Sequence, residues 1–177
     1  MINQSPTRNL LISKIVSVAG NALMLLCIFL PYASAGKDSP YRIHADETLD
    51  GIRAGELADP SMLKFLTFYN KLKGTVKSGS AIATIVTILV AVIAVAALLS
   101  IMFACLSKGI PALIFSLISF GAFLAMNWDF TDRGVVPSDE FSWGFGYYLF
   151  FVATLAAVVG AVWLIIAKHR SKRTNSL

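Results

Sequence analysis

Charged residues are scarce in this sequence. Asp, Glu, Lys and Arg make up 14% of its 177 residues, 56% are hydrophobic, and the mean hydropathy is +0.72. Soluble domains carry about 25% charged residues, so we do not expect water to surround most of this surface. The net charge is +5. The basic residues flank apolar runs instead of forming a stripe on a soluble fold, which disfavours nucleic acid as a partner.

Cysteine, histidine and catalytic motifs are also scarce. The two cysteines, Cys27 and Cys105, lie in different apolar runs, so we expect no disulfide and interpret both as apolar filler. The only histidines are His44 and His169, and no H-E-x-x-H, G-x-S-x-G or C-x-x-C motif occurs. The sequence therefore predicts a protein that is not an enzyme and has no catalytic residues, cofactor or metal.

Four long apolar runs dominate what is present. They cover residues 10–31, 80–106, 109–127 and 143–167. A helix needs about 20 apolar residues to cross the hydrocarbon layer, and backbone groups in lipid must be paired within the protein. The sequence predicts an all-α membrane protein with one membrane domain over residues 1–177, an antiparallel four-helix transmembrane bundle.

The distribution of charge predicts the orientation in the membrane. Basic residues without acids occur beside one set of run ends: Arg8, Lys14, Lys108, Lys168, Arg170, Lys172 and Arg173. We expect the protein to lie in the plasma or inner membrane of the cell. By the positive-inside rule, both termini and the tail 168–177 face the cytoplasm. The outer loops are then 32–79 and 128–142. Aromatic rings are expected at the outer boundary: Tyr32, Trp128, Trp143, Tyr147 and Tyr148.

The end of the first run permits two interpretations. Ala33-Ser34-Ala35 has the small-x-small form that signal peptidase cuts, which would remove residues 1–35. A cleavable signal has an apolar core of about 7–15 residues, and the stretch from Ile15 to Leu30 is longer. Lys14 can extend its ammonium group to the membrane interface. We expect a retained transmembrane helix.

The longer outer loop contains one amphipathic segment. Asp59-Pro60 predicts a helix N-cap followed by proline at the first helical position, and Gly74 a C-terminal stop. The apolar face of this short helix carries Met62, Phe65, Leu66, Tyr69 and Leu72. We expect the face to cover the ends of the protein's own spans. A docking face for a partner and a lid over a site are the alternatives.

Acidic residues gather in both outer loops. The first loop has His44, Asp46, Glu47, Asp50, Glu56 and Asp59, and the second has Asp129, Asp132, Asp139 and Glu140. Carboxylates are ligands for divalent cations, but the D-x-D-x-D-G spacing of a calcium loop is absent. A solvated acidic surface is the favoured interpretation, and a cation site stays open.

Inside the apolar runs, polar and small residues have packing roles. No ionisable residue lies in the middle of any run, which disfavours proton-coupled transport. Polar residues such as Asn21, Ser116 and Ser119 are interpreted as hydrogen-bonding groups between helices. Small residues recur at helix-packing spacing in the last run: Ala153, Ala156, Ala157, Gly160 and Ala161. They predict close contact with another helix of this chain or of another subunit.

Three short patches carry a resemblance. These patches are the stretch "WGFGYY", the "FLPY" that ends the first run, and the basic tail. Together they resemble a loose class of small bacterial four-span proteins of unknown function. Gly144 and Gly146 in the first patch would allow a neighbouring helix or loop to approach closely. The resemblance implies a topology and no catalytic residues. The plan of two outer loops, the first longer, also resembles claudin-type proteins, but their paired loop cysteines and tryptophan motif are absent from residues 32–79.

The favoured function is therefore that of a non-catalytic polytopic membrane protein. It would be an accessory, protective or interaction component of the cell envelope that acts through its outer loops and helix faces. Its expected partners are the lipid bilayer and another membrane protein. The alternatives are a small oligomeric channel or carrier, with a polar pore from Asn21, Ser116 and Ser119, and a membrane hydrolase or cation-binding protein that uses the outer carboxylates.

Overall fold

Four long helices form the body of the molecule. The structure, a computed structural model, describes residues 6–49, 52–74 and 79–174. The long helices are α1 (Pro6–Cys27), α5 (Gly79–Cys105), α6 (Gly109–Asp132) and α7 (Phe145–Thr174). All four contain a stretch long and apolar enough to cross a membrane: Arg8–Cys27, Ser80–Cys105, Gly109–Asp132 and Phe145–Ser171. The prediction of a mostly helical, multi-pass membrane protein is confirmed.

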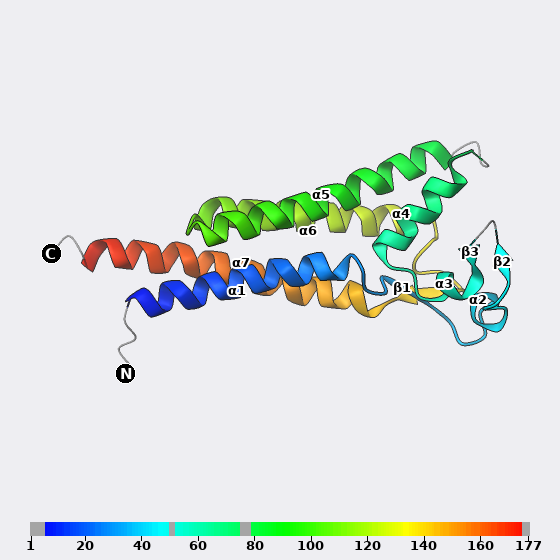
Figure 1. Cartoon of the computed structure of the whole chain (residues 1–177), viewed down its shortest axis with the longest axis horizontal. Coiled ribbons are helices and arrows are strands. Elements are labelled where there is room, and N and C mark those ends of the chain that lie inside the picture. The colour runs from blue at the N-terminus through cyan, green and yellow to red at the C-terminus, as the bar shows by residue number, and fades with distance from the viewer. Residues whose placement is uncertain (1–5, 50–51, 75–78, 175–177) are drawn as a thin grey trace.

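The long helices lie side by side in two pairs (Figure 1). α1 packs along α7 and α5 along α6, and α1 also contacts α5. The start of α1 and the end of α7 lie at one end of this body, with the turn at residues 106–108; we call it the terminal end. The short elements, from residues 28–49, 52–74 and 133–144, lie at the other, which we call the loop end.

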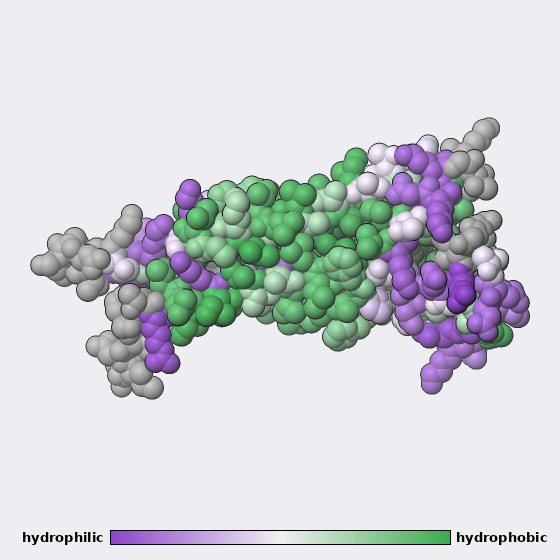
Figure 2. All heavy atoms as spheres, viewed as in Figure 1, coloured by the Kyte–Doolittle hydropathy of each residue, from purple (hydrophilic) through white to green (hydrophobic). Residues whose placement is uncertain are grey.

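The surface follows the same division. Figure 2 shows apolar residues across the middle of the visible face, with hydrophilic residues gathered at its two ends. Large apolar side chains stay exposed on the outward faces of all four helices, among them Leu11, Leu98, Ile118 and Leu155. In water such a band would be costly. Lipid is therefore the medium in contact with the middle of the helices.

The loop end contains short helices and two small sheets. Strand β1 (Ala33–Ala35) pairs antiparallel with β4 (Phe141–Trp143), and β2 (Thr48–Leu49) with β3 (Ile52–Arg53). The other elements are α2 (Pro40–Ile43), α3 (Ala54–Ala58), α4 (Met62–Lys71) and the 3₁₀ turn η1 (Leu72–Gly74). The strands depart from the all-α prediction. The Ala33-Ser34-Ala35 stretch forms β1, with Ala33 and Ala35 buried.

The helices do not begin and end where the apolar runs do. α1 ends at Cys27 instead of residue 31, because residues 28–30 make three-residue turns such as Phe29 N to Leu26 O (3.0 Å) before Pro31. α6 continues past residue 127 to Asp132. Its last turn is polar and is held by the ion pair between Asp129 and Arg133, four residues apart. Hydropathy locates a span, but a helix extends beyond it where its side chains find partners.

The predicted N-cap of the amphipathic helix is wrong. Ser61 caps α4, and its hydroxyl accepts a hydrogen bond from Lys64 N at 3.2 Å. Asp59 instead follows the end of α3, and its Oδ1 accepts from Ser34 Oγ (2.6 Å) and from the Arg42 guanidinium (2.8 Å). Pro60 disfavours a helical backbone at the residue before it. The Asp59 carboxylate therefore does not cap α4 and links the end of α3 to Ser34 and Arg42.

Two glycines bring the backbones of α1 and α7 together. A methyl group on Gly20 would lie less than 3.0 Å from the backbone of Ala157, and one on Gly160 equally close to the backbone of Ser17. Real side chains essentially never approach backbone atoms so closely. The distance between these two helices is therefore set by the absence of a side chain at both positions.

The glycine contact can be tested with one substitution at two positions. Gly160→Ala forces α1 and α7 apart, and we expect it to lower the free energy of unfolding in detergent by about 1–3 kcal/mol. Gly121→Ala is the matched control, because Gly121 also lies within a transmembrane helix but has open space around it; it should change stability by less than about 0.5 kcal/mol. Equal shifts in thermal unfolding for the two variants would contradict the packing.

Candidate functional site

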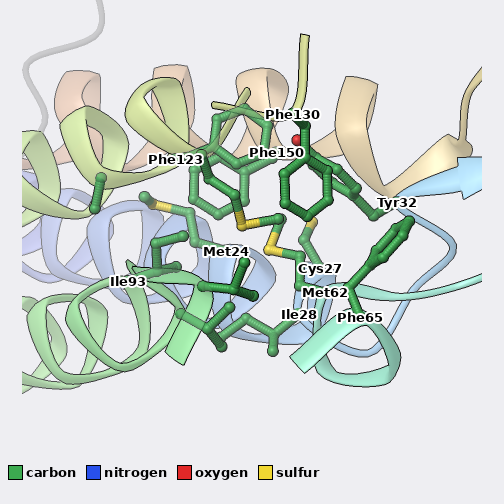
Figure 3. Packing of buried hydrophobic residues seen from close by; sticks show 14 of the residues in the cluster. Met24, Cys27, Ile28, Tyr32, Met62, Phe65, Ile93, Phe123, Phe130 and Phe150 are labelled. Carbon is green, nitrogen blue, oxygen red and sulfur yellow. The ribbon is translucent and has the colours of Figure 1, made fainter. Parts of the chain in front are cut away.

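Tyr32 is the centre of the loop end. It lies shortly after the end of α1, and its side chain is fully buried, so its ring packs inside the protein instead of on the outer surface. The hydroxyl donates a hydrogen bond to Asn127 Oδ1 at 2.5 Å. Aromatic rings from four segments meet its ring at steep angles, with centroids 5.5–6.2 Å away: Phe65, Phe123, Phe130, Trp143 and Tyr147. Figure 3 shows Tyr32 between Phe130 and Phe65.

The backbone around Tyr32 joins three segments. Tyr32 N donates to the Pro60 carbonyl (2.9 Å), Gly144 N to the Tyr32 carbonyl (2.8 Å), and Gly146 N to the Pro31 carbonyl (2.7 Å). A methyl group on either glycine would lie less than 3.0 Å from the Pro31 carbonyl oxygen. The close approach expected for the glycines of "WGFGYY" is confirmed, and its partner is the chain just after α1.

The apolar face of α4 closes over this cluster. Met62 and Phe65 are buried in it, and Leu66 and Tyr69 pack against it from partly buried positions. Leu72, in the turn after α4, is half-buried. Four of the five candidate interaction residues of this segment, all except Leu72, therefore pack against the protein itself, as in the interpretation that α4 covers the ends of its own spans.

Arg133 attaches α4 to the end of α6. Its guanidinium pairs with the Asp129 carboxylate, donates to the Tyr69 hydroxyl (3.2 Å), and lies 5.2 Å from the centre of the Tyr69 ring and 5.1 Å from that of Phe130. Burial raises the pKa of Tyr69, and the nearby Arg133 charge opposes that rise. These contacts hold Tyr69 in position as a neutral hydrogen-bond acceptor.

An open cleft of about 420 Å³ lies beside this cluster, between α4, Tyr41 and residues 134–141. Aromatic side chains form its walls: Tyr41, Phe65, Phe68, Tyr69 and Phe141. Two exposed carboxylates, Asp139 and Glu140, stand at its edge. Burial raises the pKa of Tyr41, and the charge of Glu140 adds to the rise. Both residues line the cleft. We call this feature the loop-end cleft.

The other carboxylates of the loop end have different surroundings. Asp59 pairs with Arg42, and Glu47 with His44 at 2.9 Å. Asp50 lies outside the described residues. Within residues 6–49, 52–74 and 79–174, no three His, Cys, Asp or Glu side chains come together closely enough to hold a metal ion.

Three small residues of the last span, Ala153, Ala157 and Gly160, lie against α1, and Ala161 lies beside the start of α6. Ala153, Ala157, Gly160 and Ala161 are buried, and Ala156 is half-buried. Because Gly20 and Ser17 of α1 meet Ala157 and Gly160 directly, the small-residue line of α7 is occupied within this chain.

The polar side chains proposed for a pore point into the protein. Ser116 Oγ donates to Asn21 Oδ1 (3.0 Å) and lies 2.8 Å from Ser100 Oγ, and Ser119 Oγ donates to the Ile93 carbonyl (3.0 Å). All four side chains are fully buried. They bond α1, α5 and α6 to one another, as the hydrogen-bonding interpretation requires.

Two parts of the site had no clear sequence pattern. Tyr32 and Asn127 are 95 positions apart, and each looks like an ordinary polar residue at the end of an apolar run. The cleft walls Tyr41, Phe68 and Phe141 come from three separate segments. The sequence feature that comes nearest to predicting the cleft is the concentration of aromatic residues flanking the outer loops.

Comparisons with protein-family models, curated proteins and solved structures found no match to this chain.

The hydrogen bond of Tyr32 can be measured. Tyr32→Phe leaves the Asn127 oxygen without its donor, and we expect it to lower the free energy of unfolding by about 1–3 kcal/mol at pH 7. Tyr148→Phe, at an exposed position, is the control and should change little.

The same pair of variants has an expected pH dependence. Burial raises the pKa of Tyr32 above its ordinary value, so its stabilising contribution is complete below a pH of about 10 and decreases above it, as the unfolded tyrosine ionises. The stability difference between the wild type and Tyr32→Phe should therefore narrow above pH 10 in denaturant titrations. A difference that widens there would contradict a buried, neutral Tyr32.

Proposed function

We propose that this chain is a non-catalytic multi-pass protein of the cell membrane that binds another envelope protein at its loop-end cleft. The four helices form an antiparallel bundle in the bilayer, with both termini in the cytoplasm and the cleft on the outer side. The basic residues near both termini and the Lys108 turn support this orientation.

The observation that carries the proposal is the chemistry of the cleft. Its walls are aromatic, and its edge carries the carboxylates of Asp139 and Glu140. Aromatic ring faces attract cations, most strongly where water is partly excluded, and carboxylates pair with Lys or Arg side chains. The complementary partner is a protein segment that presents a Lys or Arg beside an apolar side chain.

Part of the cleft wall is also pre-formed. Phe65 and Tyr69, which belong to its wall, are held by the Tyr32 cluster and by Arg133. A surface that is already ordered loses less conformational entropy on binding, which favours affinity. This supports a binding role for the cleft.

Site-specific photo-crosslinking in intact cells tests the proposal. A photoreactive phenylalanine analogue at position 68, in the cleft wall, should yield a discrete protein adduct. The analogue at position 43 should not, because Ile43 is exposed at the same end but does not line the cleft. Equal adducts at both positions, or adducts with lipid alone, would refute a protein-binding cleft.

Charge variants identify the chemistry of the partner. Asp139→Asn with Glu140→Gln should reduce the adduct at position 68 by about fivefold, because two exposed ion pairs at about 0.5 kcal/mol each are lost. Asp46→Asn with Glu47→Gln is the matched control, since it removes the same charge at exposed positions outside the cleft. If both double variants reduce the adduct equally, the cleft carboxylates have no specific role.

A further inference from the structure

A second cavity lies at the terminal end, between the start of α6 and the end of α7. Its volume is about 300 Å³. Ile110, Pro111 and Ile165 form an apolar floor, and three basic side chains, Lys108, Lys168 and His169, form the rim. The two surfaces differ in character: the floor belongs to the lipid-facing part of the helices, and the rim to their polar ends.

Packing between α6 and α7 holds this cavity in shape. A methyl group on Gly109 would lie less than 3.0 Å from Ile165 Cγ1, so the start of α6 lies directly against α7. The Lys168 ammonium donates to the Ser107 carbonyl at 2.9 Å. That bond keeps the ammonium at the rim and leaves two of its N–H groups for another acceptor.

The charge at this end is not balanced by acidic side chains. In the sequence, no Asp or Glu precedes Asp38, lies between Asp59 and Asp129, or follows Glu140. Among the residues that the structure describes, the acidic side chains lie in the loop-end segments and in the last turn of α6, at the opposite end of the helices (Figure 1). Two lysines and a histidine thus line the cavity beside an apolar surface, and no described acidic side chain lies near them.

We propose that this cavity binds an anionic phospholipid, with the headgroup phosphate between Lys108, Lys168 and His169 and an acyl chain over Ile110 and Ile165. The cavity is located where the apolar band gives way to polar residues, which is the depth of a lipid phosphate. Basic pockets between transmembrane helices select anionic headgroups. The apolar floor favours a lipid over a free phosphate ion, which has no group to place there.

Native mass spectrometry of the full-length protein in detergent tests the site. Phosphatidylglycerol and phosphatidylcholine with identical acyl chains are added separately, and the lipid-bound fractions are compared. Each basic residue at a membrane surface contributes about fivefold to anionic lipid binding. We therefore expect the wild type to prefer phosphatidylglycerol by about tenfold or more, and Lys108→Gln with Lys168→Gln to lose most of that preference.

Three controls separate lipid binding from other causes. Lys64→Gln with Lys73→Gln removes two charges at the loop end and should leave the preference unchanged. Lys168→Arg keeps the charge and should retain it, and Lys108→Gln alone, which leaves the Lys168 bond to Ser107 intact, should lose about fivefold if the double variant does not fold. Inorganic phosphate at millimolar concentration should not displace the lipid.

Three results would overturn the proposal. The first is an equal loss of preference in the terminal-end and loop-end variants, which would indicate a general effect of net charge. The second is equal binding of the two lipids by the wild type. The third is full competition by inorganic phosphate, which would show an anion site without a lipid chain.

Discussion

The structure depends on one constraint: hydrocarbon offers no hydrogen-bond partner to a backbone amide or carbonyl. Through the apolar band the chain is helical, and its strands and irregular links lie at the two ends. The same constraint explains the interior side chains. Asn21, Ser100 and Ser116 bond to one another or to carbonyls of neighbouring helices, since an unpaired polar group there would be costly.

Once the helices exist, close packing determines how they associate. α1 and α7 touch through glycine and alanine, whereas α1, α5 and α6 are also joined by buried hydrogen bonds. At the loop end the contacts change to aromatic rings and short backbone pairings around Tyr32. The contacts therefore differ along the molecule: glycine and alanine contacts and buried hydrogen bonds join the helices within the apolar band, and ion pairs and strand pairings occur at the loop end.

The two ends of the molecule have opposite chemistry. The acidic residues that the structure describes lie at or near the loop end, which has a cleft with aromatic walls, and the terminal end has a cavity with a basic rim and an apolar floor. Both cavities are formed between segments that are distant in sequence. The first suits a basic protein segment, and the second an anionic lipid. A membrane protein with these two sites would hold a partner on one side and select its lipid surroundings on the other.

The sequence by itself determined the four spans. Exposing about twenty consecutive apolar residues to water costs a large free energy, and no other part of the chain changes that cost. It also indicated the roles of Gly144 and Gly146, and the apolar face from Met62 to Tyr69. Only the tertiary structure decided that Tyr32 is buried, that Ser61 and not Asp59 caps α4, and that Tyr41, Phe68 and Phe141 share a cleft. Those outcomes depend on contacts between segments far apart in the chain, and local hydropathy carries no information about such contacts.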